Sequence, residues 1–111
     1  MARRTRGITS AQLVATTTSS PDAFPAEVIL RGFATFEFES EEPDRLRRLA
    51  VQFGTPRQVL KTIHAEQRLG PSSNQFTFDY AVKVPRPDDY VCEVLVDGVE
   101  VAAASLTIPP I

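Results

Sequence analysis

Two side chains in this sequence have the chemistry for nucleophilic catalysis: the thiol of Cys92 and the imidazole of His64. A cysteine attacks as its thiolate, which a neighbouring imidazole helps to form. Cys92, however, falls on the inward face of a predicted core strand, where apolar surroundings raise the pKa of a thiol and make it inert. Nothing in the spacing brings His64 beside it. We therefore expect a packing cysteine, a surface histidine and no enzyme.

Carboxylates are the second group with candidate chemistry, because several of them on sandwich loops can bind Ca²⁺. They form a run and a later pair: Glu37, Glu39, Glu41, Glu42 and Asp44, then Asp88 and Asp89. The ligand spacing of a calcium loop is absent, and Arg45, Arg47 and Arg48 follow the run and could neutralise it. We expect a solvated, charge-balanced edge that discourages aggregation. No metal or other cofactor is expected, and no small-molecule substrate is evident.

Residues 1–7 form a short basic arm that contains Arg3, Arg4 and Arg6. Such an arm could contact phosphate or dock on an acidic surface of a partner. The formal net charge of the whole chain is -2, and no aromatic residue is interleaved with the arginines. A docking or solubilising tail is therefore favoured over a nucleic-acid contact.

The sequence also bears on location. No apolar run reaches the roughly 20 residues that cross a membrane, and a Thr- and Ser-rich stretch follows the arm where a signal peptide would have an apolar segment. The single cysteine cannot form an intrachain disulfide, which favours a reducing compartment. We expect a cytoplasmic protein, or part of a particle assembled there, with no membrane association.

Alternation of apolar and polar residues predicts strands almost everywhere. The clearest are Glu27–Glu39, Gln75–Val84 and Asp89–Val96, and the weaker ones are Ile8–Thr16, Leu46–Phe53 and Arg57–Glu66. Gly32, inside the longest strand, predicts a bulge or a close approach of another backbone. A helical turn over Pro43–Arg48 is a further option, since proline suits a first helical position.

Asp97-Gly98 between two valines predicts a two-residue hairpin. The turn sets a register in which Val96 faces Val99, Val94 faces Val101 and Cys92 faces Ala103, all inward. On the outer face, Val91 then lies opposite Ala104, Glu93 opposite Ala102, and Leu95 opposite Glu100.

About seven short strands in 111 residues predict one domain over residues 8–111, an immunoglobulin-like antiparallel β-sandwich. Tyr90, two residues before Cys92, resembles the tyrosine corner of such folds. The chain has no Trp and no second Cys, so it is no disulfide-pinned antibody-type domain. A jelly roll or a small barrel is the alternative.

Two segments carry a resemblance that extends from about Phe24 to Ile108. Phe24-Pro25-Ala26 leads into a long strand, and residues 89–98 close with a tyrosine, a strand and Asp-Gly. This layout resembles an uncharacterised family of short bacterial immunoglobulin-like β-sandwich proteins, a domain of unknown function. The chain departs from it by Asp88-Asp89, where glycine is often seen. The resemblance implies the fold and no activity.

The predicted register leaves apolar residues on outer faces, and a contiguous exposed apolar patch marks an interface. The predicted interface consists of Val91, Leu95, Ala102, Ala104 and Leu106, with Ile29 and Phe33 on the long strand. We expect a non-catalytic module that binds a protein partner, or a second copy, through the outer face of the C-terminal hairpin or its loops. The first alternative is a structural subunit of a larger assembly, such as a phage or other particle component. Another is that the N-terminal strand or residues 109–111 cover the face.

Overall fold

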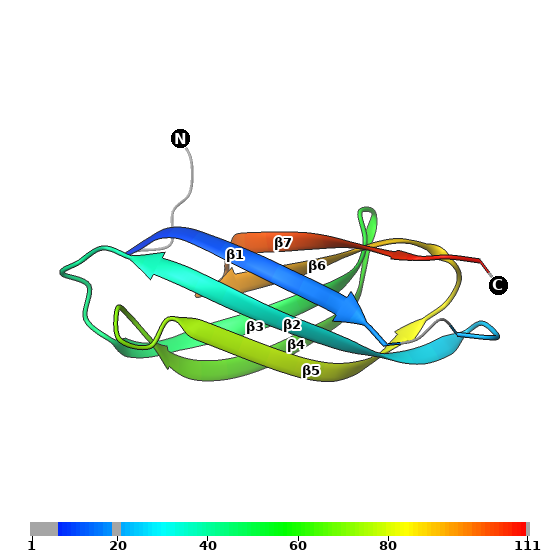
Figure 1. Ribbon diagram of the computed structural model, residues 1–111, viewed down its shortest axis with the longest axis horizontal. Coiled ribbons are helices and arrows are strands. Elements are labelled where there is room, and N and C mark those ends of the chain that lie inside the picture. Colours follow the sequence, from blue (N-terminus) through cyan, green and yellow to red (C-terminus); the bar gives the residue numbers. More distant parts are fainter. Residues whose placement is uncertain (1–6, 19–20, 111) are drawn as a thin grey trace.

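A computed structural model describes residues 7–18 and 21–110, which form seven antiparallel strands in two sheets (Figure 1). Residues 1–6 of the predicted basic arm, which include Arg3, Arg4 and Arg6, lie outside the described residues. The strands are β1 (Ile8–Thr17), β2 (Ala26–Phe38), β3 (Arg45–Thr55), β4 (Gln58–Leu69), β5 (Gln75–Val84), β6 (Asp88–Val96) and β7 (Val99–Ile108). The all-β sandwich is thus confirmed. The helical turn over Pro43–Arg48 is wrong, because β3 begins at Arg45.

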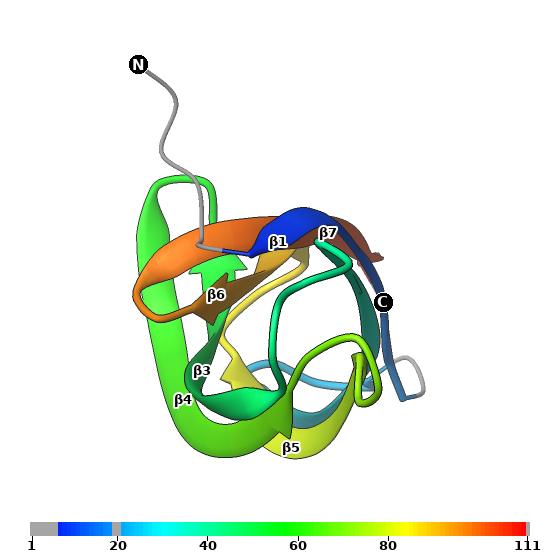
Figure 2. The ribbon, with the colours of Figure 1, turned by 90° about the vertical axis from the view of Figure 1, so that its left-hand side faces the viewer.

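The smaller sheet has the order β1-β2-β5, and the larger has the order β4-β3-β6-β7. In an immunoglobulin constant-type domain the fourth strand shares a sheet with the first, second and fifth. Here β4 pairs with β3 instead. Seen end-on, the two sheets enclose the core, with β1 close to β7 at one corner and β4 close to β5 at the other (Figure 2).

The core is built from the inward faces that alternation predicts for β2, β5 and β6. Its fully buried side chains include Leu30, Phe36, Val82, Val84, Val94 and Val96. The ring of Phe78 lies directly over Gly32, where a Cβ atom would collide with it. A close approach thus occurs at this glycine, but it comes from a side chain and not from another backbone as predicted, and the alternative of a bulge is wrong because no register shift occurs there.

Tyr90 anchors the connection between β5 and β6. Its hydroxyl donates a hydrogen bond to the carbonyl oxygen of Arg86 at 2.5 Å, and its buried ring stacks on Phe53 with centroids 5.2 Å apart. Burial raises the pKa of this phenol. The hydrogen bond back to the chain a few residues upstream is the geometry of a tyrosine corner, as predicted.

The β6–β7 hairpin has the predicted turn but a different register. Asp97 and Gly98 have φ of 51° and 83°, and Leu95 pairs with Glu100 as expected. The register then shifts, and Val94 pairs with Ala102 instead of Val101. A β-bulge adds one residue to one strand, and Val101 is that residue.

The bulge inverts the two faces of β7 beyond Val101, since a one-residue slip moves every side chain to the other side. Cys92 therefore pairs with Ala104, and Tyr90 pairs with Leu106. The predicted pairs of Cys92 with Ala103, of Val91 with Ala104 and of Glu93 with Ala102 are therefore wrong. The bulge contains no glycine that would have indicated it in the sequence.

Candidate interaction surfaces

The seven residues predicted to form one interface lie in three separate places. Val91 and Leu95 are half-buried on the outer face of the four-stranded sheet, and Ile29 and Phe33 lie on the outer face of the other sheet. Beyond the bulge, the remaining three residues pair with buried residues of β6 and face inward: Ala102, Ala104 and Leu106. The single predicted patch is therefore wrong, and its β7 part belongs to the interior.

The outer face of the C-terminal hairpin is acidic at its centre. Glu93 lies between Val91 and Leu95 along β6, and its carboxyl group shares a hydrogen bond with that of Glu100. This hydrogen bond, followed by desolvation and the charge of Glu100, raises the pKa of Glu93 to about 7. Two carboxyl groups that compete for one proton interrupt what the sequence predicted as an apolar surface.

Cys92 and His64 do not form a nucleophile–base pair. Cys92 is fully buried on the inner face of β6, and desolvation raises the pKa of its thiol to about 12. His64 is exposed on β4, and its neighbour Ala65 is the residue that packs against the core. The two side chains therefore lie on opposite sides of the four-stranded sheet, as expected for a packing cysteine and a surface histidine.

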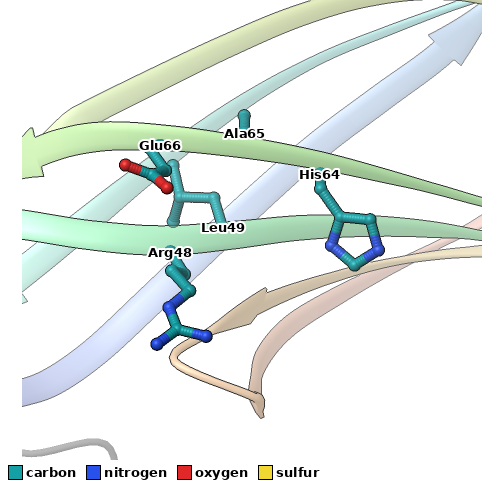
Figure 3. A pocket seen from close by; sticks show the side chains of 5 residues that line it. All are labelled: Arg48, Leu49, His64, Ala65 and Glu66. Carbon is teal, nitrogen blue, oxygen red and sulfur yellow. The ribbon is translucent and has the colours of Figure 1, made fainter.

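His64 borders a pocket of about 300 Å³ on that outer face. Figure 3 shows its side chain and that of Arg48 extending to the same side of β3 and β4. The other lining residues are Leu49, Ala65 and Glu66. The lining contains no serine, cysteine, threonine or lysine, so the pocket offers a polar surface without one of these nucleophiles.

The acidic run is partly built into the fold. Glu42 accepts a hydrogen bond from Arg47 at 2.8 Å and forms an ion pair with Arg45 at 3.1 Å, so two of the following arginines neutralise this member of the run. Asp44 binds Ser72, and these hydrogen bonds lower the pKa of Asp44. Within residues 7–18 and 21–110, no three His, Cys, Asp or Glu side chains lie close enough together to hold a metal ion.

Sequence analysis missed the position of Arg47, whose side chain is 1% exposed at the end of the core. It contacts Glu42, Asp97 at 3.4 Å and the ring of Phe38 at 5.7 Å. Asp97 also accepts a hydrogen bond from the backbone N–H of Arg48. One guanidinium thus ties the β2–β3 loop to the hairpin turn. Arg47 occupies the same alternate positions of β3 as the buried residues Leu49 and Val51, and this alternation is the signal that could have placed its side chain inside.

The outer face of the three-stranded sheet carries an exposed apolar pair. Val14 is 66% exposed and Phe33 is 39% exposed, and they are direct cross-strand partners on β1 and β2. Beside them, Arg31 and Asp79 form an ion pair at 3.1 Å. Sequence analysis identified Phe33 and missed Val14, although Val14 is in phase with the polar residues of β1.

The other large exposed apolar residues are isolated from this pair and from one another. Leu46 lies near the start of β3 opposite Arg68, and Val59 lies near the start of β4 opposite Gly54. Single exposed apolar residues are normal on protein surfaces. Val14 and Phe33 are therefore the pair that stands out among the described residues.

No protein-family model matches this chain, and no curated protein matches its sequence. The resemblance to short bacterial sandwich proteins accordingly stays a prediction. The described part of the chain holds no helix with the length and apolarity needed to span a membrane.

Proposed function

We propose that this chain is a non-catalytic protein-interaction module that uses the outer face of its three-stranded sheet. The observation that carries the proposal is the exposed pair of Val14 and Phe33. Adjacent exposed apolar side chains with a polar rim are typical of protein interfaces.

The surroundings of the pair favour a protein over a nucleic acid as the partner. The nearest charges, Arg31 and Asp79, neutralise each other, and the flanking cross-strand residues are uncharged: Gln12, Thr16, Thr35 and Thr77. A surface for phosphates would carry an excess of positive charge. A cytoplasmic location is part of the proposal, because the one thiol is free and buried.

A structural subunit of a larger assembly is the second candidate. It is favoured by two neighbouring edge strands, β1 and β7, which together contain a single charged residue, Glu100. Uncharged strand edges are suited to pairing with other chains. Docking of the arm residues Arg3, Arg4 and Arg6 on an acidic surface is compatible with either candidate.

Site-specific photo-crosslinking in the cells that make the protein tests the proposal. A benzoylphenylalanine at Phe33 should give covalent adducts larger than the chain, because this ring lies in the proposed interface. The same group at Val59, 53% exposed on β4, is the matched control and should give none. Equal adduct yields at the two positions, or none at Phe33, would contradict the proposal.

A further inference from the structure

The four edge strands of the sandwich are protected to different degrees. At the β4–β5 corner, Lys61 donates a hydrogen bond to the carbonyl oxygen of Ala81, and Gln67 donates one to that of Gln75. Side chains of one sheet thus occupy open backbone groups of the other. Both strands also carry charges, which natural proteins use to block edge-to-edge pairing.

The β1–β7 corner lacks these devices. β1 contains no charged residue and no proline in its ten residues. Among the described residues, no backbone hydrogen bond joins β1 to β7, although the two strands lie close together (Figure 2). The backbone N–H and C=O groups on the edge of β1 that faces away from β2 therefore have no partner strand.

The register of β1 shows which of its backbone groups are open. The N–H of Thr18 donates to the carbonyl oxygen of Ile29, and in antiparallel pairs every second residue bonds to the same partner. The even-numbered residues of β1 therefore bond to β2. The residues whose N–H and C=O groups point to the open edge are Ala11, Leu13, Ala15 and Thr17.

We infer that the partner is a second copy of this chain, which adds its own β1 antiparallel to β1 and joins the two small sheets into one. This inference rests on the proposed function, because the joined edge borders the Val14–Phe33 surface. A two-fold axis makes such a contact self-complementary.

The four open residues fix the register of this pairing. They are symmetric about Val14, so Ala11 pairs with Thr17 and Leu13 pairs with Ala15 of the second copy. Roughly eight backbone hydrogen bonds form, two in each hydrogen-bonded pair. Each Val14 then lies opposite its own counterpart in a non-hydrogen-bonded pair, with Cα atoms about 4.5 Å apart.

The composition of β1 suits self-pairing in particular. In a two-fold contact, a charged strand would bring like charges face to face, which is destabilising, and β1 has none. The two Val14 side chains would join the two Phe33 rings in one apolar row across the dimer. The exposed residues of β7 beyond its bulge are all small: Ala103, Ser105 and Thr107. They leave room beside β1 for the added strand.

The decisive experiment is oxidative crosslinking of the purified full chain with Val14→Cys. Opposed residues of a non-hydrogen-bonded pair are close enough for a disulfide, so we expect most of this variant to become a covalent dimer that reductant reverses. The matched control, Val59→Cys, is an exposed valine on an edge strand at the other corner and should stay monomeric. Cys92 is buried in both variants and does not interfere.

Light scattering over a range of concentrations completes the test. The wild-type chain should reach twice the monomer mass, Val14→Lys should be a monomer with an unchanged Tm, and Val59→Lys should behave as the wild type. Monomeric wild-type protein, or equal crosslinking of the two cysteine variants, overturns the inference. If Phe33 still gives adducts with other proteins in cells, the proposed function survives. If Phe33 gives none, both fail.

Discussion

The two corners at which the sheets meet differ in how their strand edges are covered. At the β4–β5 corner, Lys61 and Gln67 reach across to backbone carbonyl groups of the neighbouring sheet. At the β1–β7 corner, no such bond is formed between the strands in the described residues, and Glu100 is the only charge on either strand. Open edges pair readily with other chains unless they are protected. The contrast indicates that one corner is built to stay closed and the other to accept a strand.

The largest expected effect concerns the hairpin turn from which β7 starts, because this turn is held by the buried Arg47. Glu42→Gln removes the closest negative charge from that guanidinium, and breaking a buried pair costs about 3 kcal/mol. Arg47→Met should cost less, because Glu42 keeps its ion pair with Arg45 at 3.1 Å when the guanidinium of Arg47 is removed. The free energy of unfolding in urea measures both.

The informative result is which of these two variants loses more free energy of unfolding. If Arg47→Met destabilises the chain more than Glu42→Gln does, the guanidinium acts through its packing against Phe38 and not through its charge. The position of β7 beside β1 would then depend on packing in the core. The proposed difference in charge between the two corners would no longer be supported by Arg47.

A smaller effect is expected from opening the protected corner. Lys61→Met and Gln67→Leu together remove both hydrogen bonds from β4 to β5, at about 1 kcal/mol each. The uncovered edge should also make the protein associate at concentrations at which the wild type forms nothing beyond a dimer. Arg57→Met, an exposed change near the same strand, is the control. Light scattering that shows no added association would mean that these side chains stabilise the corner without protecting it.

Alternation in the sequence was sufficient to predict both sheets' strands, because each strand has one buried face. The close contact at Gly32 and the tyrosine corner at Tyr90 followed from local signals. The predicted interface failed because its register depended on the whole of β7. A single bulged residue, Val101, moved Leu106 into the core. The alternation of Ser105, Leu106, Thr107 and Ile108 indicates the correct faces for the end of β7, but the alanines before it hide the point at which the faces change. Assignment of each strand to a sheet, which separates Phe33 from Leu95, is a long-range property that no local pattern contains.

The smallest expected effect is a pH dependence of the free energy of unfolding. It distinguishes the hairpin face, which the sequence predicted as the interface, from the edge of β1. Hydrogen bonding to Glu100 raises the pKa of Glu93 from 4.5 to about 7. The folded state thus holds this proton more tightly than the unfolded state, so the stabilisation is complete below pH 4.5 and is lost as the pH rises through about 7. Glu100→Gln should reduce this loss, which urea unfolding between pH 4.5 and 8 would detect.

Self-association should not follow the same pH dependence if it uses β1, because that strand contains no titratable side chain. An interface on the hairpin would instead bring two pairs of Glu93 and Glu100 together and should weaken as Glu93 ionises. Light scattering of the wild type and of Glu100→Gln across the same pH range therefore assigns the contact. A dimer whose dissociation constant is constant from pH 5 to 8 places the contact at β1, since Glu93 and Glu100 lie on the opposite sheet. A dissociation constant that rises several-fold with pH in the wild type, and does not change with pH in Glu100→Gln, would place the interface on the hairpin.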